Sequence, residues 1–385
     1  MDRRSLLRVT ALGAGAVALP FTGWSAAYAV ARSGAGPYGP LCAADSHGIR
    51  LPEGFTSSVV ARSGRRVTGT SYRWHDAPDG GATFPDGDGW IYVSNSEVPA
   101  PGRGGASMIR FGADGRVTAA RRILAGTTGN CAGGGTPWRT WLSCEEIDRG
   151  KVFETYPRGG AAVARPAMGR FRHEAAAADP VRRVVYLTED EPDGRFYRFV
   201  PHRWPDLAAG RLEVLCGGPG TSGAFTWKRV PDPGGTPVRT RHQVAAAKVF
   251  HGGEGCYYAG DIVWFTTKGD GRIWQVDLKA GRYRLTYDDN LAGAGPPPLT
   301  GVDNLTGSAG GDLYVAEDGG SMEICLVTPA GRVSPFLRVT GQDSSELCGV
   351  AFSPRGDRLY FSSQRGPAGV LTDGITYCVR GPFRG

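Results

Sequence analysis

The sequence predicts an all-β protein, folded as a six-bladed β-propeller with a metal-binding channel along its centre. Three observations lead to this fold class. One short strand pattern recurs six times along the chain. The 60 glycines and 27 prolines among 385 residues indicate many turns. No window sustains the i, i+3, i+4, i+7 spacing of apolar residues that marks a long amphipathic helix.

The recurring strand reads apolar, aromatic, apolar and then Ser, Thr or Ala. Its six copies are centred on Tyr92, Trp141, Tyr186, Trp264, Tyr314 and Tyr360. These aromatic residues lie 49, 45, 78, 50 and 46 residues apart, and a four-stranded blade takes about 40 to 50 residues. Six copies therefore imply six blades around a channel. The longest interval implies an insertion at about residues 201–242, a stretch rich in Pro and Gly that we expect to form a long loop or lid. A β-sandwich with coincidental spacing is the alternative.

A partner strand is predicted before each aromatic copy, and the last five copies show candidate channel residues in it. Turn sequences such as Asp179-Pro180 separate the two strands and indicate hairpins. Ten to fourteen residues before the aromatic residue, the partner strand carries Cys131, Glu174, Glu254, Asp303 with Asn304, and Glu346, in that order. Because the innermost strand of each blade lines the channel, we expect these side chains to form a ring. Crowded carboxylates repel one another and lose hydration, so the ring predicts a bound cation.

A second set of carboxylates lies three to five residues after the aromatic residues. Its members are Glu97, Glu145, Glu146, Glu189, Asp190, Glu191, Glu317 and Asp318. Oxygen ligands in such number suit Ca²⁺, which takes about six to eight of them, whereas a thiolate suits a softer metal. The alternative is that these carboxylates at the ends of loops face solvent.

Residues 1–29 have the composition of an export signal. Arg3 and Arg4 precede an uncharged run from Val9 to about Phe21, and Ala27-Tyr28-Ala29 supplies a cleavage site. The arginine pair fits the twin-arginine signal, and an ordinary secretory signal is the alternative. We therefore expect an exported protein that uses the twin-arginine export machinery. Residues 30–385 are expected to form a single propeller domain.

Charge and cysteine usage exclude two classes of function. The net charge is +7, but the excess is scattered and forms no Lys/Arg run, so nucleic-acid binding is not expected. Eight cysteines are present without a C-x-x-C pair, which excludes a zinc ribbon. We expect a monomer whose partner is a small-molecule substrate.

The segment from Asn130 to Glu146, which reads NCAGGGTPWRTWLSCEE, resembles the signature of the PhoX-type alkaline phosphatase family. The segment GRFRHEAA at 169–176 also resembles this family, as do Gly253-Glu254-Gly255 and Asp303-Asn304-Leu305. The resemblance implies an exported six-bladed propeller that hydrolyses phosphomonoesters with iron and calcium ions. A small phosphorylated substrate is then expected.

The resemblance also implies which residues form the site. The iron (Fe³⁺) ligands would be Cys131, Glu146, Glu174 and Glu254. Further metal ligands, for calcium (Ca²⁺), would come from Glu145, Asp190, Asp303, Asn304 and Glu317. Glu174 and Glu254 are expected to be catalytic. His173, beside Glu174, is a candidate general base, and a structural histidine is the alternative.

One position departs from the family pattern. The family carries an arginine two residues before its last glutamate, where it helps to hold phosphate, and this sequence has Gly252 there. Loss of an Arg fork weakens the binding of a phosphoryl group, so an arginine placed at 252 is expected to lower KM. Candidate substitutes for the missing cation are Arg170, Arg172, Arg272 and Lys268.

Two other functions remain open at this point. A sugar-lactone hydrolase of propeller type would hold a single Ca²⁺ with Glu254, Asn304 and Asp303, but it would leave Cys131 and Glu174 without a role. A non-catalytic propeller that binds a ligand or partner is the third possibility, and Gly252 in place of arginine keeps it open.

Overall fold

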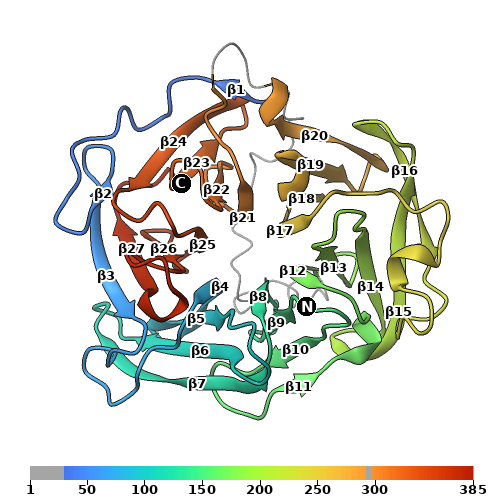
Figure 1. Ribbon diagram of the computed structural model, residues 1–385, viewed down its shortest axis with the longest axis horizontal. Coiled ribbons are helices and arrows are strands. Elements are labelled where there is room, and N and C mark those ends of the chain that lie inside the picture. The colour runs from blue at the N-terminus through green and yellow to red at the C-terminus, as the bar shows by residue number, and fades with distance from the viewer. Residues whose placement is uncertain (1–29, 292–295, 385) are drawn as a thin grey trace, which may run out of the picture.

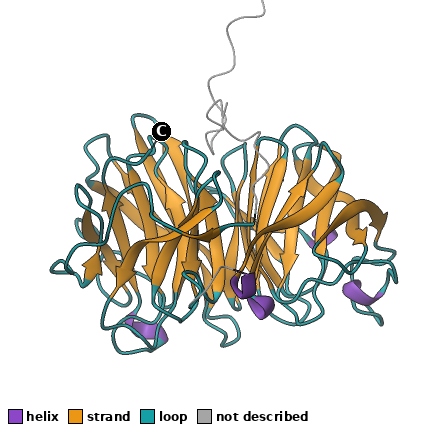
Figure 2. Cartoon of the chain, turned by 90° about the horizontal axis from the view of Figure 1, so that it is seen from above, coloured by secondary structure: helices purple, strands orange, loops and turns teal. Residues whose placement is uncertain are grey.

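The structure is a computed structural model and describes residues 30–291 and 296–384. Strands dominate these residues, and the helical elements are short 3-10 turns (Figure 2). They are η1 (Pro166–Met168), η2 (Thr240–His242), η3 (Lys268–Asp270), η4 (Asp289–Leu291) and η5 (Leu371–Asp373). No helix in the described part of the chain is long and apolar enough to cross a membrane. The predicted signal peptide, residues 1–29, lies outside the described residues.

Hydrogen bonds join the described strands into five sheets that surround one axis (Figure 1). The first sheet contains β4 (Pro78–Asp86), β5 (Gly89–Ser96), β6 (Gly104–Phe111) and β7 (Val117–Thr127). The second contains β8 (Asn130–Gly135), β9 (Trp141–Glu145), β10 (Val152–Thr155) and β11 (Val163–Ala164). Each of these two sheets is an antiparallel meander in which strands consecutive in sequence are neighbours.

The third sheet is larger. It contains β12 (His173–Asp179), β13 (Val184–Glu189), β14 (Phe196–Arg203), β15 (Asp206–Gly217), β16 (Ser222–Arg229), β17 (Gly253–Ala259), β18 (Ile262–Thr267), β19 (Arg272–Asp277) and β20 (Arg282–Asp288). The fourth contains β21 (Val302–Gly307), β22 (Leu313–Glu317), β23 (Glu323–Val327) and β24 (Arg332–Val339), with β1 (Arg32–Ser33) and β2 (Ile49–Arg50) beside β24. The fifth contains β25 (Leu347–Phe352), β26 (Arg358–Ser363), β27 (Ile375–Arg380) and β3 (Thr56–Arg62).

The prediction of an all-β propeller is confirmed, although the sheets are not six separate ones. Strand β16 pairs with β15 on one side and with β20 on the other. This bridge merges the meander β12–β15 with the meander β17–β20. At another point of the ring, β3 pairs with β27, so segments from both ends of the described chain complete one sheet. Closure of this kind protects strand edges from outside pairing.

Residues 201–242 differ from the expected long loop, because most of them lie in strands β14, β15 and β16. In β16 the residues Gly223, Phe225 and Trp227 are half-buried, while the residues between them are exposed. This alternation with period two is the pattern of a strand with one packed face. The alternating apolar residues therefore form a strand here, although the nearby Gly and Pro residues had indicated a loop.

Stacked aromatic rings pack neighbouring meanders together. Tyr92 of β5 stacks on Tyr360 of β26, with ring centroids 4.8 Å apart. Phe196 of β14 stacks on Phe265 of β18 at 4.3 Å. All six recurring aromatic residues are buried, and each such side chain contributes on the order of 1.5 to 3 kcal/mol through burial. The recurring sequence pattern therefore reflects the core between the sheets.

The strands nearest the axis form a closed ring. In order around it, they are β4, β8, β12, β17, β21 and β25, and each contacts the next, with β25 contacting β4 (Figure 1). Each pairs with the strand that carries a recurring aromatic residue, as the sequence predicted. Each of these pairings also has a register shift near the start of the inner strand. These shifts position the residues discussed next.

Candidate metal centre in the channel mouth

At the start of each inner strand, the register shift leaves two consecutive residues unpaired with the neighbouring strand of the same sheet. In β8, Asn130 pairs with Glu145 and Gly133 pairs with Ser143, so Cys131 lies between the paired positions. A bulge of this kind re-aims a side chain and is common beside active sites. The side chains at the corresponding positions in the ring are Asp79, Cys131, Glu174, Glu254 and Asp303.

The sixth position of this ring is Gly349 of β25, where the φ angle is +67°. A Cβ atom there would lie 2.6 Å from the backbone oxygen of Asp79. The close approach of β4 and the left-handed backbone together require a glycine. Five ring positions therefore carry a thiol or carboxylate, and the sixth carries no side chain.

Three overlapping groups of side chains each bring their ligand atoms within 4.8 Å of one another: Asp79 with Glu97 and Cys131, Cys131 with Glu146 and Glu174, and Glu174 with Glu254 and Asp303. Because Cys131 and Glu174 are each shared between two groups, the three form one continuous cluster. The Cys131 thiol donates to Glu174 Oε1 at 3.3 Å. Glu174 Oε2 is buried without a hydrogen-bond partner, which leaves it available to a cation.

Burial and mutual repulsion disfavour the charged forms of these carboxyl groups. Burial, with the charges of Glu254 and Glu146, raises the pKa of Glu174 well above its ordinary value. Burial likewise raises the pKa of Glu254 and of Asp303, although Lys268 acts in the opposite direction. The pKa of Glu146 is raised to about 8, first by burial and then by Glu254. Bound cations would neutralise this repulsion, so the donor set fits metal ions that take oxygen and thiolate ligands.

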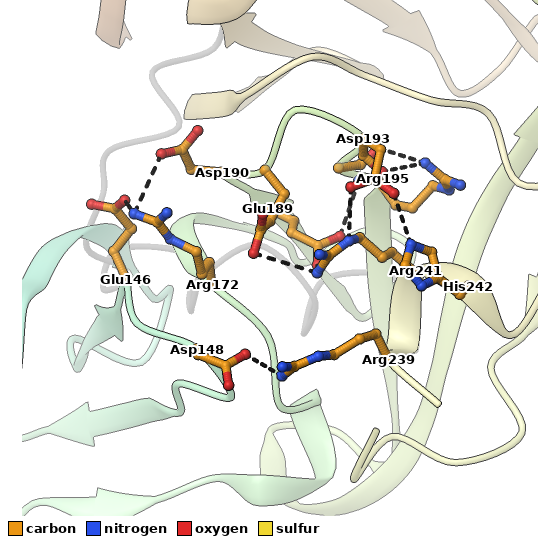
Figure 3. A network of polar contacts seen from close by, with 12 residues as sticks. Glu146, Asp148, Arg172, Glu189, Asp190, Asp193, Arg195, Arg239, Arg241 and His242 are labelled. Atoms are coloured by element: carbon orange, nitrogen blue, oxygen red, sulfur yellow. Dashed lines mark hydrogen bonds and ion pairs between the residues drawn. The ribbon is translucent and has the colours of Figure 1, made fainter. Parts of the chain in front are cut away.

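Glu146, a member of the cluster, and Asp190 lie on either side of Arg172 at the rim of the site (Figure 3). Arg172 forms ion pairs with both, and it lies 3.9 Å from Asp190 Oδ2. Asp303 Oδ1 accepts from Asn304 Nδ2 at 2.9 Å, and Asn304 Oδ1 accepts from the Gly349 amide at 2.7 Å. The structure therefore places Glu146, Asp190, Asp303 and Asn304 at the cluster or at its rim, as the sequence analysis expected.

Glu145 and Glu317 differ from the cluster carboxylates, because backbone amides donate hydrogen bonds to both of them. Glu145 Oε1 accepts from the amide of Thr128 at 3.1 Å. Glu317 Oε1 accepts from the amide of Thr300 at 2.8 Å, and its Oε2 accepts from the amide of Glu323 at 3.0 Å. These contacts hold loops in place. Glu145 is absent from the cluster. Glu317 also lies outside it, but forms a separate buried group with Glu323 and Cys325 whose ligand atoms lie within 4.8 Å of one another. The assignment of both as metal ligands stays a prediction.

His173 contacts the protein interior. Its Nε2 lies 3.1 Å from the carbonyl oxygen of Gly169, and its ring lies 3.6 Å from that of Phe171, centroid to centroid. Burial lowers its pKa to about 3. Adjacent residues of a strand point to opposite faces, which agrees with Glu174 reaching the cluster while His173 packs against Phe171. Its role as a general base stays a prediction without a contact in this structure to support it.

Sequence reasoning missed Asp79 as a member of the cluster. Gln364 Nε2 donates at 2.6 Å both to Asp79 Oδ2 and to Glu97 Oε2. Burial and the neighbouring Glu97 raise the pKa of Asp79 to about 8. Asp79 precedes Tyr92 by thirteen residues, within the ten to fourteen that relate the other inner carboxylates to their aromatic residues. The same spacing applied before Tyr92 would have found it.

The four cations considered as replacements for the missing arginine have different partners in the structure, and only Arg172 and Lys268 contact residues of the cluster. Arg170 Nε donates to the carbonyl oxygen of Arg149 at 2.7 Å. Arg272 forms ion pairs with Asp270 and Asp288. Arg172 faces the rim, and Lys268 Nζ lies 2.9 Å from Glu254 Oε1.

A network of ion pairs attaches the segment between β16 and β17 to residues next to Asp190 in the sequence (Figure 3). Arg241 lies 3.3 Å from Glu189, 3.4 Å from Glu191 and 2.9 Å from Asp193. His242 Nε2 lies 2.7 Å from Asp193 Oδ2. The segment is therefore attached to the loop that follows β13.

The opposite mouth of the channel has a different character. A cavity of about 340 Å³ there is lined by residues such as Tyr257, Tyr258, Thr306 and Phe383. None of the ring carboxylates lines it. A smaller cavity of about 40 Å³ adjoins it, and its lining includes Gly80, Ala132, Ala175 and Gly255, each of which directly follows a ring residue in the sequence. The metal-binding chemistry is thus confined to one mouth.

Comparisons with known proteins agree with this arrangement. The family model of the alkaline phosphatase PhoX matches residues 99–161 and 152–272. PhoX from Pseudomonas fluorescens, solved in complex with vanadate, a transition state analogue, superposes with a TM-score of 0.71 at 18% identity, covering 92% of this chain and 98% of that chain. A gluconolactonase from Xanthomonas campestris superposes with a TM-score of 0.50 at 14% identity, covering 90% and 99%. No curated protein matches the chain in sequence. At these identities the structural likenesses establish a shared fold.

Proposed function

We propose that the chain is a member of the PhoX family of alkaline phosphatases, as the family model indicates, and that it hydrolyses phosphomonoesters at the cluster in the channel mouth. It would then be a phosphoric monoester hydrolase whose substrate carries a phosphate group. The observation that supports this location is the continuity of the cluster, in which Cys131 and Glu174 each belong to two groups of ligand atoms. The buried Glu174 Oε2 that lacks a partner supports it further.

The proposed metals are iron and calcium. Cys131, Glu146, Glu174 and Glu254 would hold iron, because the set includes a thiol among carboxylates. Asp303, Asn304 and Asp190 would hold calcium through oxygen atoms, and Asp79 and Glu97 supply further oxygen atoms nearby. Such ions, when bound, supply Lewis-acid polarisation of the phosphoryl group. Glu145 and Glu317 support the site from outside by holding its loops.

This chain's own residues set the geometry of the reaction. The bulges fix the ring carboxylates on strands, and strands position side chains more rigidly than loops do. We place substrate entry at the mouth where Glu146 and Asp190 lie, because both side chains are partly exposed there. Arg172 contributes positive charge at that rim, which attracts an anionic substrate.

We also propose that the ring counts as six blades, with the nine-stranded sheet taken as two. The ring of six inner strands supports this count. Residues 30–385 would then form one domain. Export by the twin-arginine machinery and a monomeric state belong to the same proposal, and the arginine pair at Arg3-Arg4 supports export.

The experiment that tests this function is turnover by the metal-reconstituted protein. A chromogenic phosphomonoester, a phosphodiester and a sugar lactone would be offered in parallel, with iron and calcium content measured on the same sample. We expect the phosphomonoester to be hydrolysed fastest. Hydrolysis of the lactone alone by protein loaded with both metals would refute the proposal, because that reaction leaves Cys131 and Glu174 without a role.

A further inference from the structure

Three cations face the carboxylate cluster. Arg172 pairs with Glu146 and Asp190 at the rim. Arg365 lies 2.7 Å from Glu346 and 3.6 Å from Asp318. The third cation is Lys268.

Lys268 differs from the two arginines in what it contacts. Its Nζ lies 2.9 Å from Glu254 Oε1 and 3.2 Å from Asp318 Oδ2. Among the described residues, it is the cation that forms an ion pair with one of the carboxylates on the inner-strand bulges. It is therefore the positive charge closest to the ring itself.

The backbone holds Lys268 firmly in this place. Its amide donates to the carbonyl oxygen of Gly252 at 2.8 Å, and the amide of Gly269 donates to that of His251 at 3.0 Å. Gly252 has a φ angle of +68°, and a Cβ atom there would lie 3.3 Å from the Gly269 amide nitrogen. A glycine at 252 thus lets η3, which begins at Lys268, pack against the start of β17.

The surroundings of the ammonium group leave room for one more partner. A lysine ammonium has three N–H donors, and two carboxylates lie within ion-pair distance of Nζ. The side chain is 38% exposed, so solvent or a ligand reaches it. A phosphoryl dianion entering a cluster of carboxylates needs a fixed cation that offsets their repulsion.

We propose that Lys268 Nζ binds a phosphoryl oxygen of the substrate and thereby selects dianionic phosphomonoesters over monoanionic phosphodiesters and neutral lactones. This inference rests on the proposed function, since it assigns a residue to that reaction. The positive charge comes from Lys268 at the start of η3. Gly252, which directly precedes β17, has no side chain that could supply it. The third N–H of the ammonium group donates to the phosphate, while Glu254 and Asp318 orient the other two.

The test uses the full-length, metal-loaded protein and the variants Lys268→Met and Lys268→Arg. Lys279→Met is the matched control, because Lys279 is exposed in the turn between β19 and β20. Binding of inorganic phosphate is measured by calorimetry, metal content by elemental analysis, and KM and kcat with a phosphomonoester and a phosphodiester.

We expect Lys268→Met to keep its metals and to bind phosphate about 10-fold more weakly, the loss typical of one charge-assisted hydrogen bond. KM for the phosphomonoester should rise by a similar factor, and KM for the phosphodiester should change less. Lys268→Arg should recover most of the phosphate affinity, and Lys279→Met should match the parent protein.

Two results would overturn the inference. In one, metal-loaded Lys268→Met binds phosphate as tightly as the parent protein. In the other, Lys268→Met loses its metals, which would show that Lys268 acts by holding Glu254 in place and not by binding phosphate. A parent protein that fails to hydrolyse any phosphomonoester, yet whose phosphate affinity depends on Lys268, would refute the proposed function and support the lysine assignment. The two failures are therefore distinguishable.

Discussion

Cys131 and Glu174 are 43 residues apart in the sequence, yet the Cys131 thiol donates to Glu174 Oε1 at 3.3 Å. The contact joins the bulges of β8 and β12, which are neighbours in the ring of inner strands. Both side chains are buried. The pair therefore forms the centre of the cluster, and replacing either residue changes two groups of ligand atoms at once.

Replacing Cys131 with serine should remove iron and leave calcium. Cys131 would bind as an anionic thiolate, and the far less acidic serine hydroxyl would not replace that charge. We expect the purified protein to have a purple or brown colour from charge transfer between thiolate and iron, and Cys131→Ser to be colourless. Elemental analysis and visible absorption measure this. Cys42→Ser is the control, because Cys42 is exposed and lies outside the cluster. An iron-loaded, coloured Cys131→Ser protein would contradict the assignment.

The metal-free protein should lose stability as pH rises from about 4 to about 8. Asp79 and Glu146 have pKa values raised to about 8 in the folded state by burial, against ordinary values near 4 in the unfolded chain. Between those pH values the folded state binds more protons than the unfolded state, so the free energy of unfolding falls as pH rises. Thermal unfolding of chelator-treated protein across this range measures the effect.

Adding calcium and iron should reverse that dependence, because cations stabilise the ionised carboxylates. The Tm of the loaded protein should hold steady or rise between pH 5 and pH 8. Parallel slopes for the chelated and loaded samples would show that the raised pKa values are unrelated to metal binding.

Replacing Arg241 with methionine should destabilise the protein. Arg241 lies beside Glu189, Glu191 and Asp193, and the Glu189 side chain is fully buried. Breaking a buried ion pair leaves an uncompensated charge and costs about 3 to 5 kcal/mol. Arg239→Met is the matched control, since Arg239 and its partner Asp148 are both exposed and such pairs contribute about 0 to 1 kcal/mol. Denaturant unfolding compares the two. Equal losses would show that the network does not hold the segment between β16 and β17.

Replacing Gly252 with arginine should cost stability, and this cost opposes the lower KM that the sequence predicts for the variant. The φ angle of +68° at Gly252 is unfavourable for any residue with a Cβ atom, by about 1 to 2 kcal/mol. A Cβ atom would also lie 3.1 Å from Asp190 Oδ1. Gly281→Arg is a control with a φ angle of +66° and open space around it. A Gly252→Arg protein with unchanged Tm and lower KM would show that the backbone adapts.

The sequence by itself determined the class of fold and most of the channel residues. The recurring aromatic residues predicted strands β5, β9, β13, β18, β22 and β26, and their burial between sheets is the reason for the recurrence. Distance along the chain from those residues identified Cys131, Glu174, Glu254 and Asp303. The same spacing was wrong for Glu346, which precedes β25, and the ring position there is Gly349. These features depend on local alternation and turn signals, which a single sequence displays.

The tertiary structure decided what each polar side chain contacts. Glu145 and Glu146 are consecutive in sequence, but backbone amides occupy the first, and the second forms an ion pair with Arg172. The bulges, the bridge from β16 to β20 and the approach of Lys268 to Glu254 depend on strands that are distant in the sequence. A periodic pattern assigns a residue to a face of a strand, but only the packing of neighbouring strands determines which atoms meet there.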